Sequence, residues 1–393
     1  MKEGWEYRKL GEICDFRSGF AFKSNKFTKI GEPIIRISDI QNEEIDDSNL
    51  VYFDPKSYTE DLSKYLIYPD DILIAMSGGT TGKIGINTSN RTYYLNQRVG
   101  VFRENKKYLN HRYLFYFLHT KSEESLKIAA GAAQPNLSTA QIKSFLIPVP
   151  SLSEQQSIVD YLDSAFAKID AMKANAEKAL NEAKALFQAS LKEMLEPKEG
   201  WVTSTLKDEC YKITDGTHQT PKYYPSGYIF LSSRNVTSRK IDWEDVKFID
   251  ESQHQLMYKR VAPQVGDILL AKNGTTGVAA MVDRDVVFDI YVSLALLRSR
   301  GNVTPEYLLA FVNSPIAKEQ FDKRLIGMGV PNLHLGEINQ VVITYPQDKV
   351  EQIRMTQRIE ELDCLIIRLQ ENYDKISQEC DALKQAILRQ VFE

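Results

Sequence analysis

Two short loops rich in glycine and hydroxyl residues have the clearest chemical character in the sequence. SGGTTGK covers residues 77–83, and KNGTTGV covers residues 272–278. Small hydroxyl side chains and exposed backbone N–H groups suit contacts to phosphate oxygens. A tight β-turn retained for folding explains the same residues equally well, so both interpretations stay open. The candidate residues in these loops are Ser77, Gly79, Thr80, Thr81, Lys83, Lys272, Asn273, Thr275 and Thr276.

The first loop departs from a nucleotide-binding P-loop. Gly78 and Gly82 are one residue too close together, and Ile84 stands where Ser or Thr is needed. The sequence also lacks GxGxxG after a strand, GxSxG, HExxH and the Asn-Pro-Pro-aromatic tetrapeptide of amino-group methyltransferases. Its five histidines are scattered. We therefore expect no catalytic residue and no metal site in this chain.

A second set of donor-rich side chains falls at predicted strand and loop ends. Arg, Asn and Gln are the side chains that read guanine and adenine edges in DNA. Each of them taken singly is also explained as a solvated surface group, so the hypothesis rests on the set. The candidates are Arg36, Gln97 and Arg98, followed by Thr217, His218, Arg234 and Asn235.

These candidates belong to a duplicated pattern. EGW at residues 3–5 recurs at 199–201, an offset of 196. Further matches close to that offset are DILIAMSGGTTGKIG from Asp71 with DILLAKNGTTGVAA from Asp267, Cys14 with Cys210, Arg103 with Arg298, Pro135-Asn136-Leu137 with Pro331-Asn332-Leu333, and Pro150 with Pro346. One offset held this long indicates duplication of a whole domain. The segments between the matches differ widely, which predicts one kind of task on two different targets.

Each half leads into a predicted long helix with a heptad seam, the first opening at an N-cap at Ser153. The first seam is Ile158, Leu162, Ala165, Ile169, Met172, Ala176, Ala179, Ala183 and Leu186. The second is Ile359, Leu362, Ile366, Leu369, Tyr373, Ile376, Cys380, Leu383 and Ile387. The small residues of one seam and the large residues of the other favour close packing of the two helices, and a pseudo-two-fold axis between the repeats would make the pair antiparallel. Two unrelated surface helices are the alternative.

Each globular half is predicted to be mixed α/β. The expected strands are residues 33–40, 71–76, 99–103 and 142–149, and the expected short helices are 111–119 and 305–313. The net charge is −4, of which residues 153–196 carry −3 and residues 349–393 carry −2. The acidity therefore lies on the helices, and the globular halves have room for local basic surfaces.

The remaining features of composition indicate a cytoplasmic protein. No apolar run approaches 18 residues, which predicts no membrane span. The segment MKEGWEYRKL has no apolar core of a secretory signal. The four cysteines show no CxxC pairing, so we expect reduced thiols.

In their order and duplication, these features resemble the specificity subunit of Type I restriction–modification systems. The resemblance covers the whole chain. It is carried by the Gly-Trp pairs, the two Gly-Thr-Thr-Gly loops, Asn96-Gln97-Arg98, the Pro-Asn-Leu turns, and the pairs Glu154-Gln155 and Glu351-Gln352 that open the helices. Tyr291-Val292-Ser293 replaces Asn96-Gln97-Arg98 in the second half, so a base-reading role of Gln97 is not expected to be shared.

The resemblance implies an α+β fold with two target recognition domains, at residues 1–152 and 197–347. Two long helices, at 153–196 and 348–393, would join them as an antiparallel coiled coil. Each domain would read one half of a bipartite, asymmetric site in double-stranded DNA, and the helices would set the spacing. The helices would also dock two methyltransferase subunits, which supply S-adenosylmethionine, and restriction subunits would join through these.

Three other functions stay open at this point. The first is the specificity chain of a related system in which methylation and cleavage share one polypeptide. The second is a coiled-coil scaffold that binds proteins and no DNA. The third is an enzyme that uses the glycine-rich loops.

Overall fold

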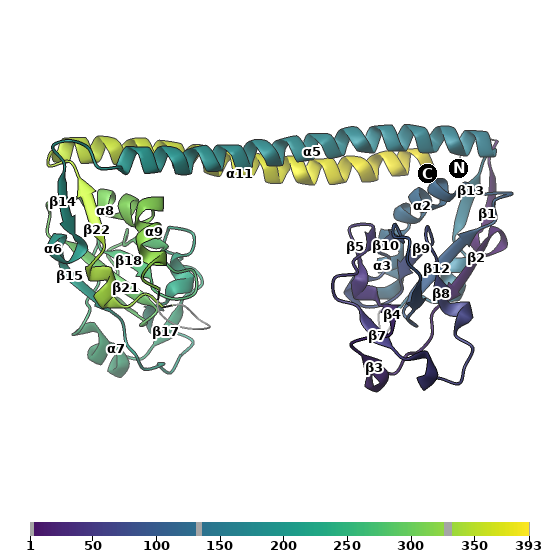
Figure 1. Cartoon of the computed structure of the whole chain (residues 1–393), viewed down its shortest axis with the longest axis horizontal. Coiled ribbons are helices and arrows are strands. Elements are labelled where there is room, and N and C mark those ends of the chain that lie inside the picture. The colour runs from purple at the N-terminus through teal and green to yellow at the C-terminus, as the bar shows by residue number, and fades with distance from the viewer. Residues whose placement is uncertain (1–3, 131–135, 326–331, 393) are drawn as a thin grey trace. The chain divides into compact units, whose positions relative to one another are not determined.

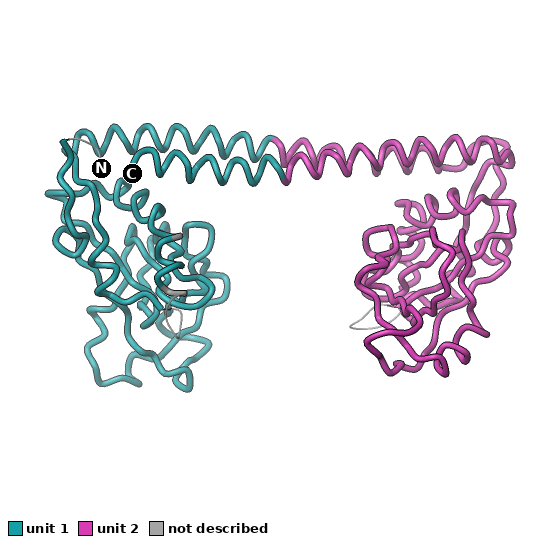
Figure 2. The backbone as a smooth tube through the Cα atoms, turned by 180° about the vertical axis from the view of Figure 1, so that it is seen from behind, with its two compact units in different colours: residues 1–175, 375–393 teal, residues 176–374 magenta. Residues whose placement is uncertain are grey.

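The computed structural model describes residues 4–130, 136–325 and 332–392. The chain divides into two compact units, one made of residues 1–175 with 375–393 and the other of residues 176–374 (Figure 2). Each unit therefore combines one globular part with a portion of both long helices. Pro135 and Pro331, which we placed in matching turns, lie outside the described residues.

The first unit contains two main sheets and a short strand pair (Figure 1). The larger sheet has the order β2 (Cys14–Ser18), β12 (Val99–Glu104), β9 (Ile72–Ala75), β10 (Ile84–Ile86), β6 (Glu44–Ile45) and β5 (Ile40–Gln41). The second has the order β3 (Phe27–Thr28), β7 (Val51–Phe53), β4 (Glu32–Ile35), β11 (Tyr93–Leu95) and β8 (Leu66–Ile67). The pair is β1 (Glu6–Lys9) with β13 (Leu146–Val149), and the helices are α1 (Leu10–Ile13), α2 (His111–Thr120), α3 (Ser122–Ala130), α4 (Thr139–Lys143) and the first part of α5 (Leu152–Leu195).

The second unit repeats this plan with fewer strands. Its larger sheet has the order β15 (Cys210–Asp215), β21 (Leu294–Ser299), β18 (Ile268–Ala271) and β19 (Ala279–Met281). Its smaller sheet has the order β17 (Lys247–Ile249), β16 (Tyr228–Leu231) and β20 (Phe288–Ile290), and β14 (Val202–Thr205) pairs with β22 (Val342–Tyr345). The helices are α6 (Leu206–Glu209), α7 (Glu251–Tyr258), α8 (Pro305–Val312), α9 (Pro315–Asp322), α10 (Leu335–Asn339) and most of α11 (Lys349–Phe392).

The strand registers of the two units are equivalent, which confirms the duplicated α+β fold. Arg103 on β12 and Arg298 on β21 each bind an aspartate that opens the neighbouring strand. The Nη2–Oδ2 distances are 2.6 Å to Asp71 and 2.7 Å to Asp267. Both aspartates also accept a backbone N–H, from Tyr68 and Gln264. These four charged residues form the same ion pair at the same place in each unit.

Two of the predicted strands are shorter than expected. Ile142 belongs to α4, whose first turn is capped by Ser138, and the strand begins only at Leu146. β4 ends at Ile35 because the carboxylate of Asp39 accepts the backbone N–H of Arg36 (2.8 Å) and starts a short 3-10 helix, η2 (Ile37–Asp39). Local capping side chains ended these strands. The predicted helices at 111–119 and 305–313 are confirmed as α2 and α8.

α5 and α11 pair antiparallel within each unit, as predicted. In the first unit Asp170 contacts Lys384 (2.6 Å) and Lys173 contacts Asp381 (3.2 Å), so later residues of one helix face earlier residues of the other. In the second unit Lys184 donates a hydrogen bond to Gln370 (2.7 Å).

The predicted seams are correct at only part of their positions. Leu162 and Ile169 are buried, but Met172 and Leu186 are 59% and 69% exposed, and Leu180 is buried in the place predicted for Ala179. On α11, Leu369 and Leu383 are also exposed. The predicted and observed seams are both heptad repeats, offset so that they share every second position. Adjacent apolar residues such as Leu186 and Phe187 do not distinguish between them.

One buried glutamine fastens each long helix to its globular part. Gln155 accepts the backbone N–H of Asn110 and donates to the carbonyl groups of Tyr108 and Pro150. Gln352 makes the same three contacts, with Thr304, Asn302 and Pro346. The N-cap of α5 is Ser151, whose hydroxyl accepts from the N–H of Glu154, and the prediction of Ser153 was wrong by half a turn.

The hydrophobic core of each unit includes residues from both long helices. In the first unit Leu388 and Phe392 of α11 pack with α2, where the Phe392 ring lies 5.0 Å from that of Tyr113. In the second unit Phe187 and Leu191 of α5 share a core with Ile359 of α11. None of the described helices is both long enough and apolar enough to cross a bilayer.

Candidate nucleic-acid interface

In the first unit, four segments meet at one end of the sheets, which we call the loop end. Register pairs Ala75 with Val99 and Ser18 with Gly100, so the residues that follow β9, precede β12 and follow β2 lie together. The parallel pairing of β4 with β11 adds the residues that follow β4. The four segments are residues 19–20, 36–39, 77–83 and 96–98.

Three predicted residues of the first unit present free side chains at this loop end. Lys83, Gln97 and Arg98 are exposed, and within the described chain their side chains make no hydrogen bond or ion pair. Arg36 is only half exposed, because its guanidinium binds the carboxylate of Asp39 (3.0 Å) and the carbonyl of Asn49 (3.0 Å). Three of the four predicted donors are thus available to a ligand without rearrangement.

The hydroxyl residues of the first loop are less available. Gly79 is exposed, whereas Ser77 and Thr80 are half-buried. Thr81 is 2% exposed and donates its hydroxyl proton to the carbonyl of Gly78 (2.7 Å). Its burial corrects the prediction of a DNA contact and gives Thr81 a structural role within the loop.

The second unit has the same loop end. Register pairs Ala271 with Leu294 and Asp215 with Ala295, and β16 lies parallel to β20. The segments that meet are therefore residues 216–219, 232–236, 272–278 and 291–293. Both glycine-rich loops also turn in the same way, since Gly78 and Gly274 have φ of +74° and +75°, a region that favours glycine. The positive φ values therefore support the interpretation of both loops as tight turns retained for folding.

The predicted residues of the second unit differ in accessibility. His218, Arg234 and Thr275 are exposed, although Arg234 forms an ion pair with Asp245 (2.6 Å). Thr217, Asn273 and Thr276 are half-buried. Asn235 is 3% exposed, and its amide donates to the carbonyl of Asp245 (3.0 Å). Asn235 therefore holds the loop in shape, and its predicted DNA contact is corrected.

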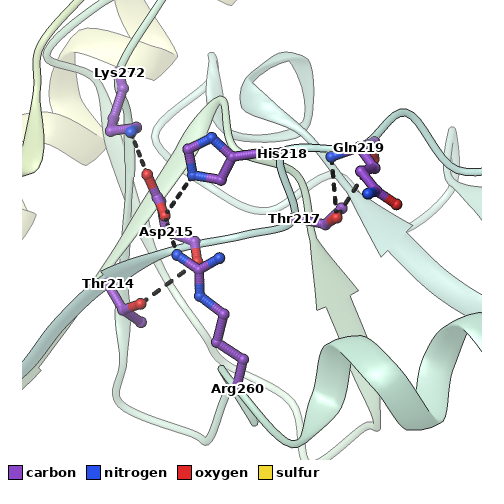
Figure 3. Close-up of polar contacts among 7 residues, drawn as sticks. All are labelled: Thr214, Asp215, Thr217, His218, Gln219, Arg260 and Lys272. Atoms are coloured by element: carbon purple, nitrogen blue, oxygen red, sulfur yellow. Dashed lines mark hydrogen bonds and ion pairs between the residues drawn. The ribbon is translucent and has the colours of Figure 1, made fainter.

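Lys272 is the other predicted residue that is buried. Its ammonium group binds the carboxylate of Asp215 at 2.6 Å, and both side chains are about 5% exposed or less (Figure 3). Burial alone would raise the pKa of Asp215, but the hydrogen bond and charge of Lys272, together with those of His218, lower it below its ordinary value. Lys272 thus neutralises a buried carboxylate, and we no longer assign it a direct DNA contact.

Asp215 and Arg260 also lie at this loop end and were not predicted. Arg260 donates from Nη2 to Oδ1 of Asp215 at 2.8 Å, and His218 Nε2 lies 3.3 Å from the same oxygen. Arg260 lies 45 residues from Asp215, so no sequence spacing could have linked them. No group of three or more His, Cys, Asp or Glu among the described residues is arranged to hold a metal ion.

The fold and the two loop ends define a duplicated recognition protein whose modules share a helical connector. Residues 2–182 match the family of the Type I restriction modification DNA specificity domain. The specificity subunit of the Type I restriction enzyme EcoKI, from Escherichia coli K12, is 25% identical over 422 residues, which cover 100% of this chain and 89% of that one. The chain is similar over its whole length to Type I restriction–modification specificity subunits, and residues 2–182 match their DNA specificity domain.

Solved structures agree with this fold. A chain from a study of complex assembly and conformational transition of the type I R-M system has a TM-score of 0.73 and 19% identity, over 99% of this chain and 97% of that chain. The HsdS subunit from Thermoanaerobacter tengcongensis has a TM-score of 0.54 and 18% identity, over 99% and 97%. At these identities the likeness establishes the fold alone.

Proposed function

We propose that each unit reads one half of a bipartite, asymmetric site in double-stranded DNA through its loop end. The observation that carries this proposal is a shared scaffold with different side chains at equivalent places. Asn96, Gln97 and Arg98 follow β11 in the first unit, whereas Tyr291, Val292 and Ser293 follow β20 in the second. Two domains of one origin with different donors suit two different half-sites.

The long helices suit the role of a spacer. A helix of 44 residues is about 66 Å long, and half-sites on one face of DNA are separated by roughly 35 Å per helical turn of the duplex. Adding one turn to both helices would lengthen them by about 5.4 Å. At about 3.4 Å per base pair, the unread spacer would grow by one or two base pairs.

The same helices also suit protein docking. α11 leaves Leu365, Ile367 and Leu369 between 40% and 51% exposed, and both helical segments are acidic. Exposed apolar groups on a surface that repels DNA favour a protein partner. The proposed partners are two methyltransferase subunits that bind S-adenosylmethionine and modify adenine, with restriction subunits joining through them. The proposed role of this chain in the complex is recognition without catalysis.

Co-expression with the methyltransferase subunit, followed by mapping of methylated adenines, tests the proposal. We expect one split motif with two unlike halves and a spacer of fixed length. A chain that associates with its partner but directs no sequence-specific methylation would favour a protein-binding scaffold instead.

A further inference from the structure

The buried carboxylate of Asp215 organises one internal cation and two surface donors. Its Oδ2 binds Lys272 inside the unit, and its Oδ1 binds Arg260 and His218, whose side chains are 51% and 64% exposed. Figure 3 shows Lys272 and Arg260 reaching Asp215 from opposite sides. One carboxylate therefore binds both a buried cation and two exposed donors at the loop end.

The first unit does without this ion pair. Ser18 pairs with Gly100 three residues before Arg103, as Asp215 pairs with Ala295 three residues before Arg298. By the same registers, Met76 occupies the place of Lys272, and it is buried. The fold therefore forms with Ser and Met at these two positions. Because burying two charges gives little net stability, the Asp–Lys pair calls for another explanation.

Arg260 is the group that the ion pair fixes at the surface. Only Nη2 of its guanidinium is bound to Asp215, which leaves its other donors open. The backbone is fixed as well, since the carbonyl of Arg260 accepts from Lys212 (2.8 Å) and its N–H donates to the carbonyl of Met257 (3.1 Å). An exposed arginine held at both its backbone and its tip is prepared for a ligand of fixed geometry.

We propose that Arg260 reads a guanine edge in the second half-site, with Asp215 as its positioning residue. A phosphate contact requires mainly positive charge, and an adjacent carboxylate would weaken it. A guanine contact instead requires that the guanidinium meet O6 and N7 together, which depends on orientation. This inference rests on the proposed function, in which the second unit reads one half-site.

Arg260→Lys tests the reading role, because it retains the charge and removes the planar fork. In the reconstituted complex, binding is measured on DNA duplexes that carry each single-base change in both half-sites. We expect the variant to lose about 5- to 150-fold of discrimination at one G·C pair of the second half-site and none in the first. Lys259→Ala, at the neighbouring exposed cation, is the control and should leave discrimination unchanged.

The positioning role is tested by combining Asp215→Ser with Lys272→Met, which installs the residues of the first unit. We expect a melting temperature near that of the native chain. We also expect the same loss of discrimination, at the same base pair, as with Arg260→Lys. Retained discrimination in this double variant would overturn the role of Asp215. If it fails to fold, Asp215→Glu provides a second test, since a longer carboxylate moves the guanidinium and should reduce discrimination while Lys272 stays paired.

The outcomes separate this inference from the function on which it rests. If the native complex recognises no bipartite site, the proposed function fails. If it recognises one, but Arg260→Lys weakens every duplex equally, Arg260 contacts phosphate and the inference is overturned while the proposed function stands. A second half-site without any G·C pair overturns the inference in the same way.

Discussion

At the scale of single residues, Lys83 is the clearest candidate for a phosphate contact. It is exposed at the loop end of the first unit, and its side chain has no partner within the described chain. We expect Lys83→Ala to weaken binding similarly on all DNA sequences and to reduce the slope of log affinity against log salt by about 0.9. Titration with labelled duplexes at several salt concentrations measures both quantities.

Lys106→Ala is a matched control for this variant. Lys106 is also exposed, but it follows β12, at the end of that strand opposite to Arg98. Its removal should leave the salt dependence unchanged. A Lys83 variant that altered base preference and kept its affinity would contradict the phosphate assignment.

The sequence was sufficient to find the loops but not to rank their side chains. Lys83, Gln97 and Arg98 are exposed as their residue types suggested. Thr81 and Lys272 have equally suitable chemistry, yet both are buried: Thr81 binds Gly78 within its own loop, and Lys272 binds Asp215, 57 residues away. Residue type indicates which contact is possible, and only the fold determines which side the group faces.

At the scale of elements, the buried glutamines link the long helices to the globular parts. Gln352→Ala removes three hydrogen bonds, of which the one to the carbonyl of Pro346 is buried and the other two are part-buried. We expect the free energy of unfolding of the second unit to fall by about 2–4 kcal/mol, since each unsatisfied buried group costs about 1–3 kcal/mol. Urea denaturation followed by circular dichroism measures the loss.

Gln357→Ala provides the comparison on the same helix, because Gln357 is exposed. Its effect should lie within about 0.5 kcal/mol. Equal stability of the two variants would show that the three hydrogen bonds of Gln352 contribute nothing net.

The helices show how far periodicity alone can predict an element. The sequence predicted the heptad repeats, the antiparallel pairing and the lengths of α5 and α11. The register was only partly predicted, because runs such as Leu186-Phe187 are apolar at both candidate positions. The strand ends were missed where a side chain, such as that of Asp39, caps a turn that no hydrophobic pattern records.

At the scale of the whole molecule, the duplication predicts that the half-sites can be exchanged independently. Replacing residues 1–150 by those of a relative should change one half of the methylated motif and leave the other half unaltered. Methylome sequencing of cells that express the chimera provides the measurement. Simultaneous change of both halves would contradict independent reading.

The position of the exchange boundary affects how the new domain packs against α11. Tyr113 and Phe117 of the exchanged part both contact Phe392, so the donor must fit the retained end of α11. A second chimera that also exchanges residues 375–393 removes this constraint. We expect both to give the same new half-site, with the second at least as stable to heat.

Because the first unit includes residues 375–393, the order of synthesis also determines which unit can complete its fold first during translation. Residues 176–374, which form the second unit, are continuous and leave the ribosome together. The first unit needs residues 375–393, including Leu388 and Phe392 of its core, and these are synthesised after the whole of the second unit. The half of the protein that is made first is therefore finished last, and a premature stop codon near position 375 damages the amino-terminal unit most.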